Sequence, residues 1–328
     1  MRRVAVIGAG LSGLVAAREL RDCSEVTVFE KSRGYGGRLA TRYGGEFEFD
    51  HGAQYFTARS AEFQEFLEPL IAQGAVARWR ARFAELDRDT VVATRDWDDA
   101  FPHYVGAPRM NAIGKYLADG LTMRQNTTVA HLDREADGWS LADSDGNALG
   151  RFDWVVCALP AAQTAALVPA ASRLHQLAGA VPMRACYALM LGFDRPLRLP
   201  WQAALVNGAD ISWISVNNSK PQRADRFTLV VHSTNAYADA NLDTHLPAVQ
   251  DHLLEEVSEV TGIDCGQASF CQLQRWRYAN VDKRSGPACL VDEETQLAGC
   301  GDWFRHGRVE AAFSSGREVA GQLRALVA

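Results

Sequence analysis

The stretch VAVIGAGLSGLVAARELRDCSEVTVFEKSRGYGGRLATR, Val4–Arg42, decides the fold that we expect for this chain. The valine- and isoleucine-rich run Arg3–Ile7 ends at a glycine, which predicts a buried parallel strand. Apolar residues then recur at helical spacing over Leu11–Leu20, and Glu25–Glu30 predicts a second apolar strand. Strand, glycine turn, helix and strand in roughly thirty residues form a βαβ unit.

Three glycines in the first turn, Gly8, Gly10 and Gly13, match the pattern G-x-G-x-x-G. The first permits a tight turn, the second lets the backbone approach a pyrophosphate, and the third lets helix and strand pack closely. The helix N-terminus then offers unpaired N–H groups to phosphate. Glu30, at the end of the second strand, can accept hydrogen bonds from ribose hydroxyls and would repel a 2′-phosphate. The pattern predicts a dinucleotide site that does not hold NADP; the alternative is a glycine-rich turn without a ligand.

A second glycine cluster follows Glu30 in KSRGYGGRLATR. Gly34, Gly36 and Gly37 allow backbone conformations that are closed to other residues, and Arg38 can then be directed at a diphosphate. A domain that binds only a nicotinamide dinucleotide has no need of this cluster. A longer dinucleotide could use both clusters; the alternative is a glycine-rich surface loop.

The continuous motif E-K-S-x-x-x-G-G-R resembles the glutathione-reductase-type FAD fold and, within it, the flavin amine oxidase group. This resemblance implies bound FAD. It also implies that FDHGAQYFTAR, Phe49–Arg59, lies beside the flavin ring, that Val129 reads the adenine through its backbone, and that LAGCGDWFRHGRVEAAFSSGREVA is a second FAD signature. The helix that starts near Val309 would then direct its N-terminal dipole at the flavin. The cofactor-binding residues expected on these grounds are Gly8, Gly10, Leu11, Ser12, Gly13, Glu30, Lys31, Gly36, Gly37, Arg38, Gln54, Tyr55, Phe56, Val129, Gly301, Asp302, Arg308, Val309 and Ala312.

The fold class implied is α/β: a Rossmann-like FAD domain of the glutathione reductase type with an inserted, strand-rich α+β second domain. The expected FAD domain covers residues 1–57, 103–166 and 288–328, and the expected substrate domain covers 58–102 and 167–287. Further helices are expected at 62–73, 111–118, 245–261 and from 309 to the end. Further strands are expected at 76–83, 127–134, 138–142, 151–159, 183–194, 226–234 and 296–300.

Over essentially the whole chain, the sequence resembles the renalase branch of this group, especially its bacterial form. The segments that carry this resemblance include EKSRGYGGRLATR, DHGAQYFTAR, VNNSKPQR, QRWRYA and GDWFRHGRVEAAFSSG. The resemblance implies oxidation of the 2- and 6-dihydro isomers of NAD(P)H by hydride transfer to flavin N5, with dioxygen as the electron acceptor and hydrogen peroxide as a product. Such a reaction needs stacking, orientation and exclusion of water but no strong base. Two alternatives remain: an amine oxidase acting on a small amine, and an FAD-binding redox sensor without turnover.

Candidates for the substrate site lie in the middle of the chain. Trp276 and Tyr278 are one strand step apart, so they share a face and either wall a slot for the substrate ring or belong to the core. Lys220 is either a lysine linked through water to flavin N5, as in amine oxidases, or a solvated loop residue. Asn218 and its neighbour Asn217 could hold a carboxamide. The remaining candidates are Arg184, Arg275 and Arg277 for the substrate diphosphate, and His51 and His306 for a flavin contact or a structural role.

Seven scattered cysteines without a CxxC pair predict reduced thiols, a cytoplasmic protein and no metal site. Neither Cys289 nor Cys300 stands where amine oxidases link their flavin, so the FAD is expected to be non-covalent. The start MRRVAVIGAG resembles a leader peptide, but we interpret it as a strand. The formal net charge of −6, with both signs interspersed, predicts no nucleic-acid or membrane partner. The oligomeric state stays open.

Overall fold

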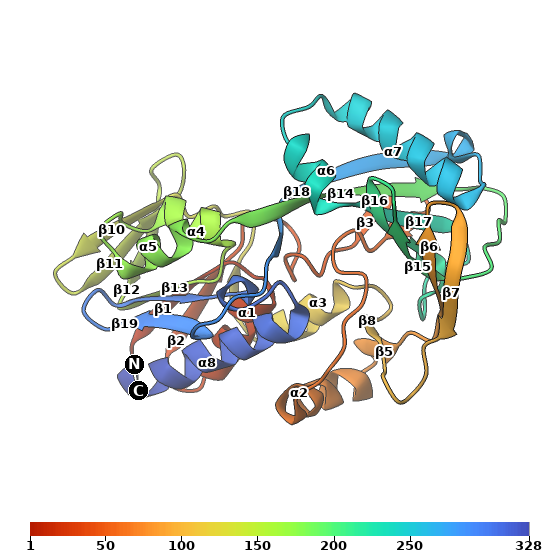
Figure 1. Ribbon diagram of the computed structural model, residues 1–328. Helices are drawn as coiled ribbons and strands as arrows, with labels where there is room; N and C mark the ends of the chain where they lie inside the picture. Colours follow the sequence, from red (N-terminus) through yellow and green to blue (C-terminus); the bar gives the residue numbers. More distant parts are fainter. Residues whose placement is uncertain (328) are drawn as a thin grey trace. The chain divides into compact units, whose positions relative to one another are not determined.

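The computed structural model describes residues 1–327, so Ala328, the end of the expected C-terminal helix, lies outside the described residues. The chain forms two compact units (Figure 1). Unit 1 comprises residues 1–39, 113–183 and 280–328, and unit 2 comprises residues 40–112 and 184–279. Both units are discontinuous in sequence, and their boundaries differ from those of the expected FAD and substrate domains. Residues 40–57 fall in unit 2 because the strand there, β4 (Phe47–Phe49), packs with Met190 and Val230 of that unit.

Unit 1 is built on a six-stranded sheet in the order β19-β20-β13-β1-β2-β9. All neighbouring strands are parallel except the antiparallel edge pair β19–β20. The inner strands are rich in valine and isoleucine because both of their faces are covered. The strands are β1 (Arg3–Ile7), β2 (Glu25–Phe29), β9 (Thr122–Arg124), β13 (Trp154–Cys157), β19 (Cys289–Asp292) and β20 (Leu297–Cys300).

Two helices from opposite ends of the chain pack together in unit 1: α1 (Leu11–Leu20) and α8 (Val309–Val327) (Figure 1). Gly316 of α8 makes the close approach possible, since a Cβ at this position would lie 2.3 Å from the carbonyl oxygen of Ser12. The first and last α-helices of residues 1–327 therefore pack against each other.

The rest of unit 1 contains a three-stranded antiparallel sheet, in the order β10-β11-β12, and three short helices. The single strand expected at 151–159 is divided between β12 and β13 at Asp153. This residue turns the chain because its backbone and carboxylate both bond to the backbone of Arg3. These elements are β10 (His131–Glu135), β11 (Gly138–Ala142), β12 (Ala148–Phe152), α3 (Ala112–Ala118), α4 (Ala161–Leu167) and α5 (Arg173–Gly179).

Unit 2 is built on a seven-stranded sheet in the order β18-β14-β17-β16-β15-β6-β7. Of these strands, β7, β15 and β16 have no counterpart among the predicted strands, and no bounds were predicted for β18. The predicted strand at 76–83 is two strands, because β5 (Val76–Arg78) leaves the sheet to pair with β8 (Tyr104–Gly106). The strands of the large sheet are β6 (Arg82–Asp87), β7 (Thr90–Asp96), β14 (Met183–Gly192), β15 (Ala203–Asn207), β16 (Ile211–Val216), β17 (Thr228–Ser233) and β18 (Phe270–Val281).

The two faces of this sheet differ in chemistry. One face is apolar and packs against Val249, Leu253 and Val257 of α7 (Leu246–Thr261), which Figure 1 draws across the sheet. Because successive side chains of a strand point to opposite faces, every second side chain of each strand lies on the opposite face. This opposite face, here called the polar-aromatic face, is defined by Trp213, Ser215, His232, Trp276 and Tyr278.

Chain segments outside the large sheet complete unit 2. Strands β3 (Arg42–Gly44) and β4 form a hairpin, and the ring of Phe49 in β4 stacks on the ring of Phe270 in β18. The remaining helices are α2 (Ala61–Ala72) and α6 (Asn235–Ala240). Within residues 1–327, no helix has the length and apolar character needed to cross a membrane.

Candidate active site

The first glycine cluster forms a turn that only glycine fits. Gly8 has a φ of +107°, and a Cβ on Gly13 would lie 2.1 Å from the carbonyl oxygen of Gly8. Gly10, by contrast, has open space where a Cβ would be. The turn is thus tight where strand meets helix and open where a phosphate would approach.

The helix that follows this turn begins without a protein cap. Gly10 is the N-cap of α1 and, within residues 1–327, makes no side-chain capping bond to the first amides, which belong to Leu11, Ser12 and Gly13. Unpaired amides at a helix N-terminus bind anions through hydrogen bonds and the helix dipole. This end of α1 can therefore hold a diphosphate.

Glu30 lies at the end of β2, beside the same turn, and is 9% exposed. One carboxylate oxygen accepts from the Ala9 amide at 2.9 Å, and the other accepts from the amide of Ser32 at 2.9 Å. The carboxylate is therefore fixed next to the diphosphate end of α1, where a ribose would be bound. Lys31, the next residue, is exposed.

The second glycine cluster lies directly against the first. The amide of Gly36 donates to the carbonyl of Ala9 at 2.8 Å, and Gly36 forms a parallel bridge with Gly10. Gly37 has a φ of +58°, and a Cβ there would lie 3.2 Å from the Cα of Gly10. The two clusters, separated in sequence, form one continuous glycine-lined surface.

Arg38 and Asp302 meet beside this surface. Their side chains form an ion pair at 2.5 Å, with Asp302 only 6% exposed. Asp302 opens a short 3₁₀ turn, Asp302–Phe304, after Gly301, whose amide donates to Ser315 of α8 at 2.7 Å. Five predicted cofactor contacts thus lie at one corner of unit 1: Arg38, Gly301 and Asp302, with Arg308 and Val309 at the start of α8. Ala312 follows within the first turn of α8, and Val129 buries its side chain in the unit 1 core, which leaves its backbone for a ligand.

These residues fit FAD, because the uncapped amides, the open glycine surface and the fixed Glu30 carboxylate match a diphosphate and a ribose. Neither Cys289 nor Cys300 is suited to attack a flavin. Burial raises the pKa of the Cys289 thiol to about 12 and raises the pKa of Cys300 further in the same direction. A thiol held in its neutral form is a weak nucleophile.

Replacing Glu30 with alanine is expected to weaken FAD binding by at least tenfold, because hydrogen bonds to a charged acceptor contribute about 1.5–3 kcal/mol each. Flavin fluorescence during titration of the apoprotein measures this affinity. Glu30→Gln is the matched control, since it keeps the shape of the side chain and removes its charge; we expect an intermediate affinity. An unchanged affinity in Glu30→Ala would place the ribose elsewhere.

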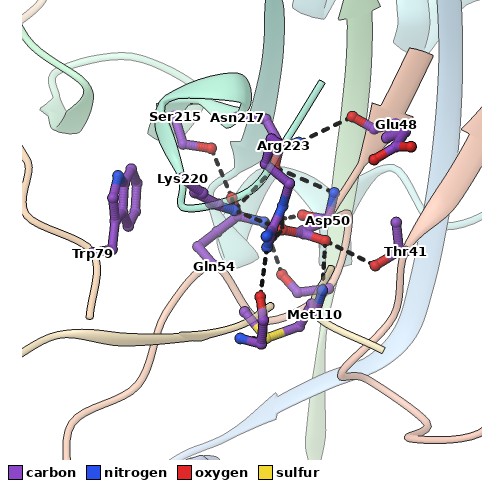
Figure 2. Close-up of polar contacts among 12 residues, drawn as sticks. Thr41, Glu48, Asp50, Gln54, Trp79, Met110, Ser215, Asn217, Lys220 and Arg223 are labelled. Atoms are coloured by element: carbon purple, nitrogen blue, oxygen red, sulfur yellow. Dashed lines mark hydrogen bonds and ion pairs between the residues drawn. The ribbon is translucent and has the colours of Figure 1, made fainter. Parts of the chain in front are cut away.

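Unit 2 contains a buried ion cluster formed by Asp50, Lys220 and Arg223 (Figure 2). Arg223 lies 2.6 Å from the Asp50 carboxylate and Lys220 lies 3.4 Å from it; all three side chains are at most 1% exposed. Asp50 also accepts from the Thr41 hydroxyl at 2.8 Å and from the Met110 amide at 3.0 Å. Burial alone would raise the pKa of Asp50, but the two cations lower it below its ordinary value.

Lys220 is saturated with partners rather than solvated. Its ammonium donates to the side-chain oxygens of Asn217 at 3.0 Å and Gln54 at 3.2 Å, in addition to Asp50 (Figure 2). It also lies 5.3 Å from the centre of the Trp79 ring. Burial lowers its pKa to about 8, with Asp50 opposing this effect and Arg223 adding to it.

Gln54 connects the ion cluster to the polar-aromatic face. Its amide oxygen accepts from Ser215 of β16 at 2.7 Å, and its nitrogen lies 3.4 Å from a ring nitrogen of His232. The neighbouring Tyr55 contacts the rings of Trp97, His103 and Trp213. Phe56 is 5% exposed and packs on Phe63 and Tyr104. Of these three predicted cofactor contacts, Gln54 and Tyr55 therefore take part in networks within unit 2, and both backbone groups of Phe56 are paired with those of Tyr104.

Trp276 is held in place by His51. The indole N–H donates to the His51 carbonyl at 2.9 Å, and the two rings stack with centroids 5.1 Å apart and planes 21° apart. Tyr278 follows two residues later on the same side of β18. The structure thus places the predicted aromatic pair on the polar-aromatic face and joins one member of it to His51.

The other sequence candidates lie apart from this group. Asn218 accepts from the amide of Thr228 at 3.2 Å, behind the ion cluster. Each arginine candidate already has a partner: Arg184 pairs with Asp239, Arg275 donates to the Leu242 carbonyl, and Arg277 lies 3.5 Å from Asp243. His306 lies in unit 1, near Arg308 and Lys283, which together with burial lower its pKa.

Sequence reasoning missed Arg223, His232 and the role of Asp50. Asp50 follows the run FEF, in which Phe47 and Phe49 both point into the core. An acidic residue directly after such a run was the one local signal that this carboxylate is buried. Its two cationic partners lie 170 and 173 residues away, so no local pattern links them to it.

Burial keeps His51 and His232 neutral and lowers the pKa of each to about 4. As the pH falls, these histidines take up protons near pH 6.5 in the unfolded chain but only near pH 4 in the folded protein. The stability that their neutral forms contribute is therefore fully present above pH 6.5 and is lost as the pH falls toward 4. Each histidine should contribute about 3 kcal/mol to this loss. Denaturant unfolding at pH 7.5 and pH 4.5 measures it. We expect His232→Gln to reduce the difference, whereas the exposed His131→Gln should leave it unchanged; an unreduced difference in His232→Gln would contradict the assignment.

One group of metal-ligating side chains lies away from this site. Asp210, His252 and Glu256 have ligand atoms within 4.8 Å of one another and are partly exposed. His252 and Asp210 already pair at 2.9 Å, and Glu256 caps the Asp210 amide. Each side chain therefore has a partner within the protein.

Comparison with known proteins agrees with this architecture. The profile of the NAD(P)-binding Rossmann-like domain matches residues 6–70, and that of the flavin containing amine oxidoreductases matches residues 71–324. Renalase of Mus musculus is 24% identical over 351 residues, covering 97% of this chain and 98% of that protein.

Solved structures share the fold over 99% of both chains. An Exiguobacterium sp. 255-15 protein, provisionally named a protoporphyrinogen oxidase, has a TM-score of 0.79 at 12% identity. A triple mutant of putrescine oxidase has a TM-score of 0.75 at 14% identity, and the cyclohexylamine oxidase of Brevibacterium oxydans IH-35A has 0.72 at 13%. The chain therefore belongs to the flavin containing amine oxidoreductase family, as a renalase-like, FAD-dependent oxidoreductase.

Proposed function

We propose that the protein oxidises the 2- and 6-dihydro isomers of NAD(P)H to NAD(P)+ and passes the electrons to dioxygen. The observation that carries this proposal is the pairing of the buried Asp50 carboxylate with two cations. This carboxylate belongs to the ion cluster, and Lys220 and Arg223 both bind it. Two cations and one anion leave a surplus positive charge beside the polar-aromatic face.

That surplus charge disfavours an amine substrate in its ammonium form, because a desolvated cation needs an anionic partner. A dihydronicotinamide ring is uncharged and needs none. Its own ring nitrogen drives hydride departure, so the site needs to supply no base. The neutral state of His51 and His232 agrees with this requirement, since neither adds a charge.

FAD, when bound, accepts the hydride and returns both electrons to dioxygen, so that the dihydronicotinamide, O₂ and one proton become NAD(P)+ and H₂O₂. The chain's own residues bind and orient. Glu30, Arg38 and the two glycine clusters hold the cofactor, while Trp276, stacked on His51, offers a flat apolar surface to the substrate ring. Tyr278 on the same strand side extends that surface, and Lys220 holds Gln54, which lies beside His232 of the same face. Asn218 stays a proposed contact for the substrate carboxamide. Holding two reactants in place accounts for much of a rate enhancement of this kind.

The test mixes the holoprotein anaerobically with 6-dihydroNAD, ordinary 4-dihydro NADH and simple amines, each in turn, and follows the flavin absorbance. We expect rapid bleaching by 6-dihydroNAD and bleaching slower by roughly a hundredfold, or none, with NADH. The reason is positional: hydride transfer needs the reacting carbon within about 3–3.5 Å of its acceptor, and a shift on the order of 1 Å costs about a hundredfold in rate.

Other outcomes separate the alternatives. Equal bleaching by the 4- and 6-dihydro isomers would contradict the positional argument. Rapid reduction by amines alone would assign the protein to the amine oxidases, and no reduction by any of these compounds would favour a redox sensor without turnover.

A further inference from the structure

One side-chain nitrogen of His51 is buried without a hydrogen-bond partner in residues 1–327. The His51 side chain is buried, at 5% exposure, and the unpaired atom is its Nδ1. More than nine-tenths of buried polar groups in proteins are paired, so an unpaired nitrogen here calls for a partner from outside the chain.

The surroundings prevent His51 from finding a partner by moving. Its carbonyl accepts from the Trp276 indole, and its ring stacks on that indole. The preceding residue, Asp50, is fixed by Lys220 and Arg223. The imidazole is therefore held in place, stacked on the indole that is proposed to bind the substrate ring.

We propose that His51 is the specificity-determining residue of this site and that its Nδ1 hydrogen-bonds the carboxamide of the nicotinamide ring. This inference rests on the proposed function. The ligand must be planar to stack beside Trp276. It must also carry a neutral hydrogen-bonding substituent, because the groups that face His51 are cationic or neutral apart from the paired Asp50: Arg42, His232 and Trp276. A carboxamide has both a donor and an acceptor, so it satisfies Nδ1 in either neutral tautomer of the imidazole.

The product side of the reaction offers a test that does not depend on turnover. The probes are NAD+ and pyridine adenine dinucleotide, which lacks the carboxamide, and their dissociation constants are measured from the change in the flavin spectrum of the holoprotein. We expect the wild type to prefer NAD+ by about tenfold, the value of one hydrogen bond. His51→Phe, which keeps a flat ring, should reduce the preference to less than about twofold. His51→Asn, which keeps a polar atom near the Nδ1 position, should retain a preference of at least about threefold.

An equal affinity of the wild type for both probes would overturn the assignment without any variant, and so would an undiminished preference in His51→Phe. FAD content of each variant shows whether it has folded. Failure of this inference is distinct from failure of the proposed function. A wild type that 6-dihydroNAD reduces but that binds both probes equally overturns the role of His51 alone. A wild type that no dihydronicotinamide reduces overturns the proposed function, on which this inference rests, whatever the ratio of affinities.

Discussion

Replacing Trp276 with alanine is expected to slow reduction of the flavin by 6-dihydroNAD about a hundredfold while FAD stays bound. The indole is fixed at two points, by its N–H bond to the His51 carbonyl at 2.9 Å and by the stack on the His51 ring. Its removal takes away the surface that would align the substrate ring, and loss of alignment on the order of 1 Å costs roughly a hundredfold. Glu30, Arg38 and the two glycine clusters, which are predicted to bind the diphosphate and ribose of FAD, lie in unit 1, so we expect the cofactor content not to change. Stopped-flow absorbance gives the rate, and the ratio of flavin to protein absorbance gives the FAD content.

Trp276→Phe is the matched control for this experiment. It keeps an aromatic plane but loses the bond to His51, so we expect a loss of about tenfold or less, consistent with one neutral hydrogen bond. An alanine variant that reduces at the wild-type rate would show that Trp276 belongs only to the core. Loss of FAD from that variant would show instead that this side chain supports cofactor binding.

Replacing Asp50 with alanine is expected to destabilise the protein by about 3–5 kcal/mol, because it leaves two buried cations without their anion. The apparent Tm of the holoprotein should fall by roughly 4–7 °C. Differential scanning calorimetry measures the change. Asp99→Ala is the control, since Asp99 also pairs with two arginines, Arg78 and Arg80, but in an exposed position. Exposed ion pairs contribute about 0–1 kcal/mol, so that variant should stay close to the wild type.

A second substitution separates loss of charge balance from loss of packing at Asp50. If the unpaired cations cause the damage, Asp50→Ala combined with Lys220→Met should be more stable than Asp50→Ala alone, because one buried charge has been removed. Additive losses in the double variant would contradict the electrostatic explanation.

Much of unit 1 could be predicted from the sequence because its signals are local. The strand, glycine turn and helix at 3–20 appear at the predicted residues, since each depends on neighbours within a few positions. The two glycine clusters also lie together, as a shared dinucleotide ligand requires. The boundary between β12 and β13 was harder to predict from the sequence, because Asp153 turns the chain through bonds to Arg3, 150 residues away.

The site in unit 2 was less predictable because its connections are long-range. Lys220 was expected either near flavin N5 through water or in solvent, and its actual partners come from Asp50, Gln54 and Asn217. Strands β15 and β16 were missed because they are short and lack a strict apolar–polar alternation; the burial pattern along Ile211–Val216 shows three buried residues in succession. Trp276 and Tyr278 could be placed on one face because period-two alternation is itself local.

The pairing of α1 with α8 has a consequence for the order in which the protein can be made. Unit 2 contains no residue beyond 279, so all of its chain has been synthesised while unit 1 still lacks β19, β20 and α8. During synthesis one side of α1 in the amino-terminal βαβ segment therefore stays uncovered until α8 has been made. Unit 2 can therefore complete its fold before the phosphate-binding turn and the helix after it reach their final surroundings.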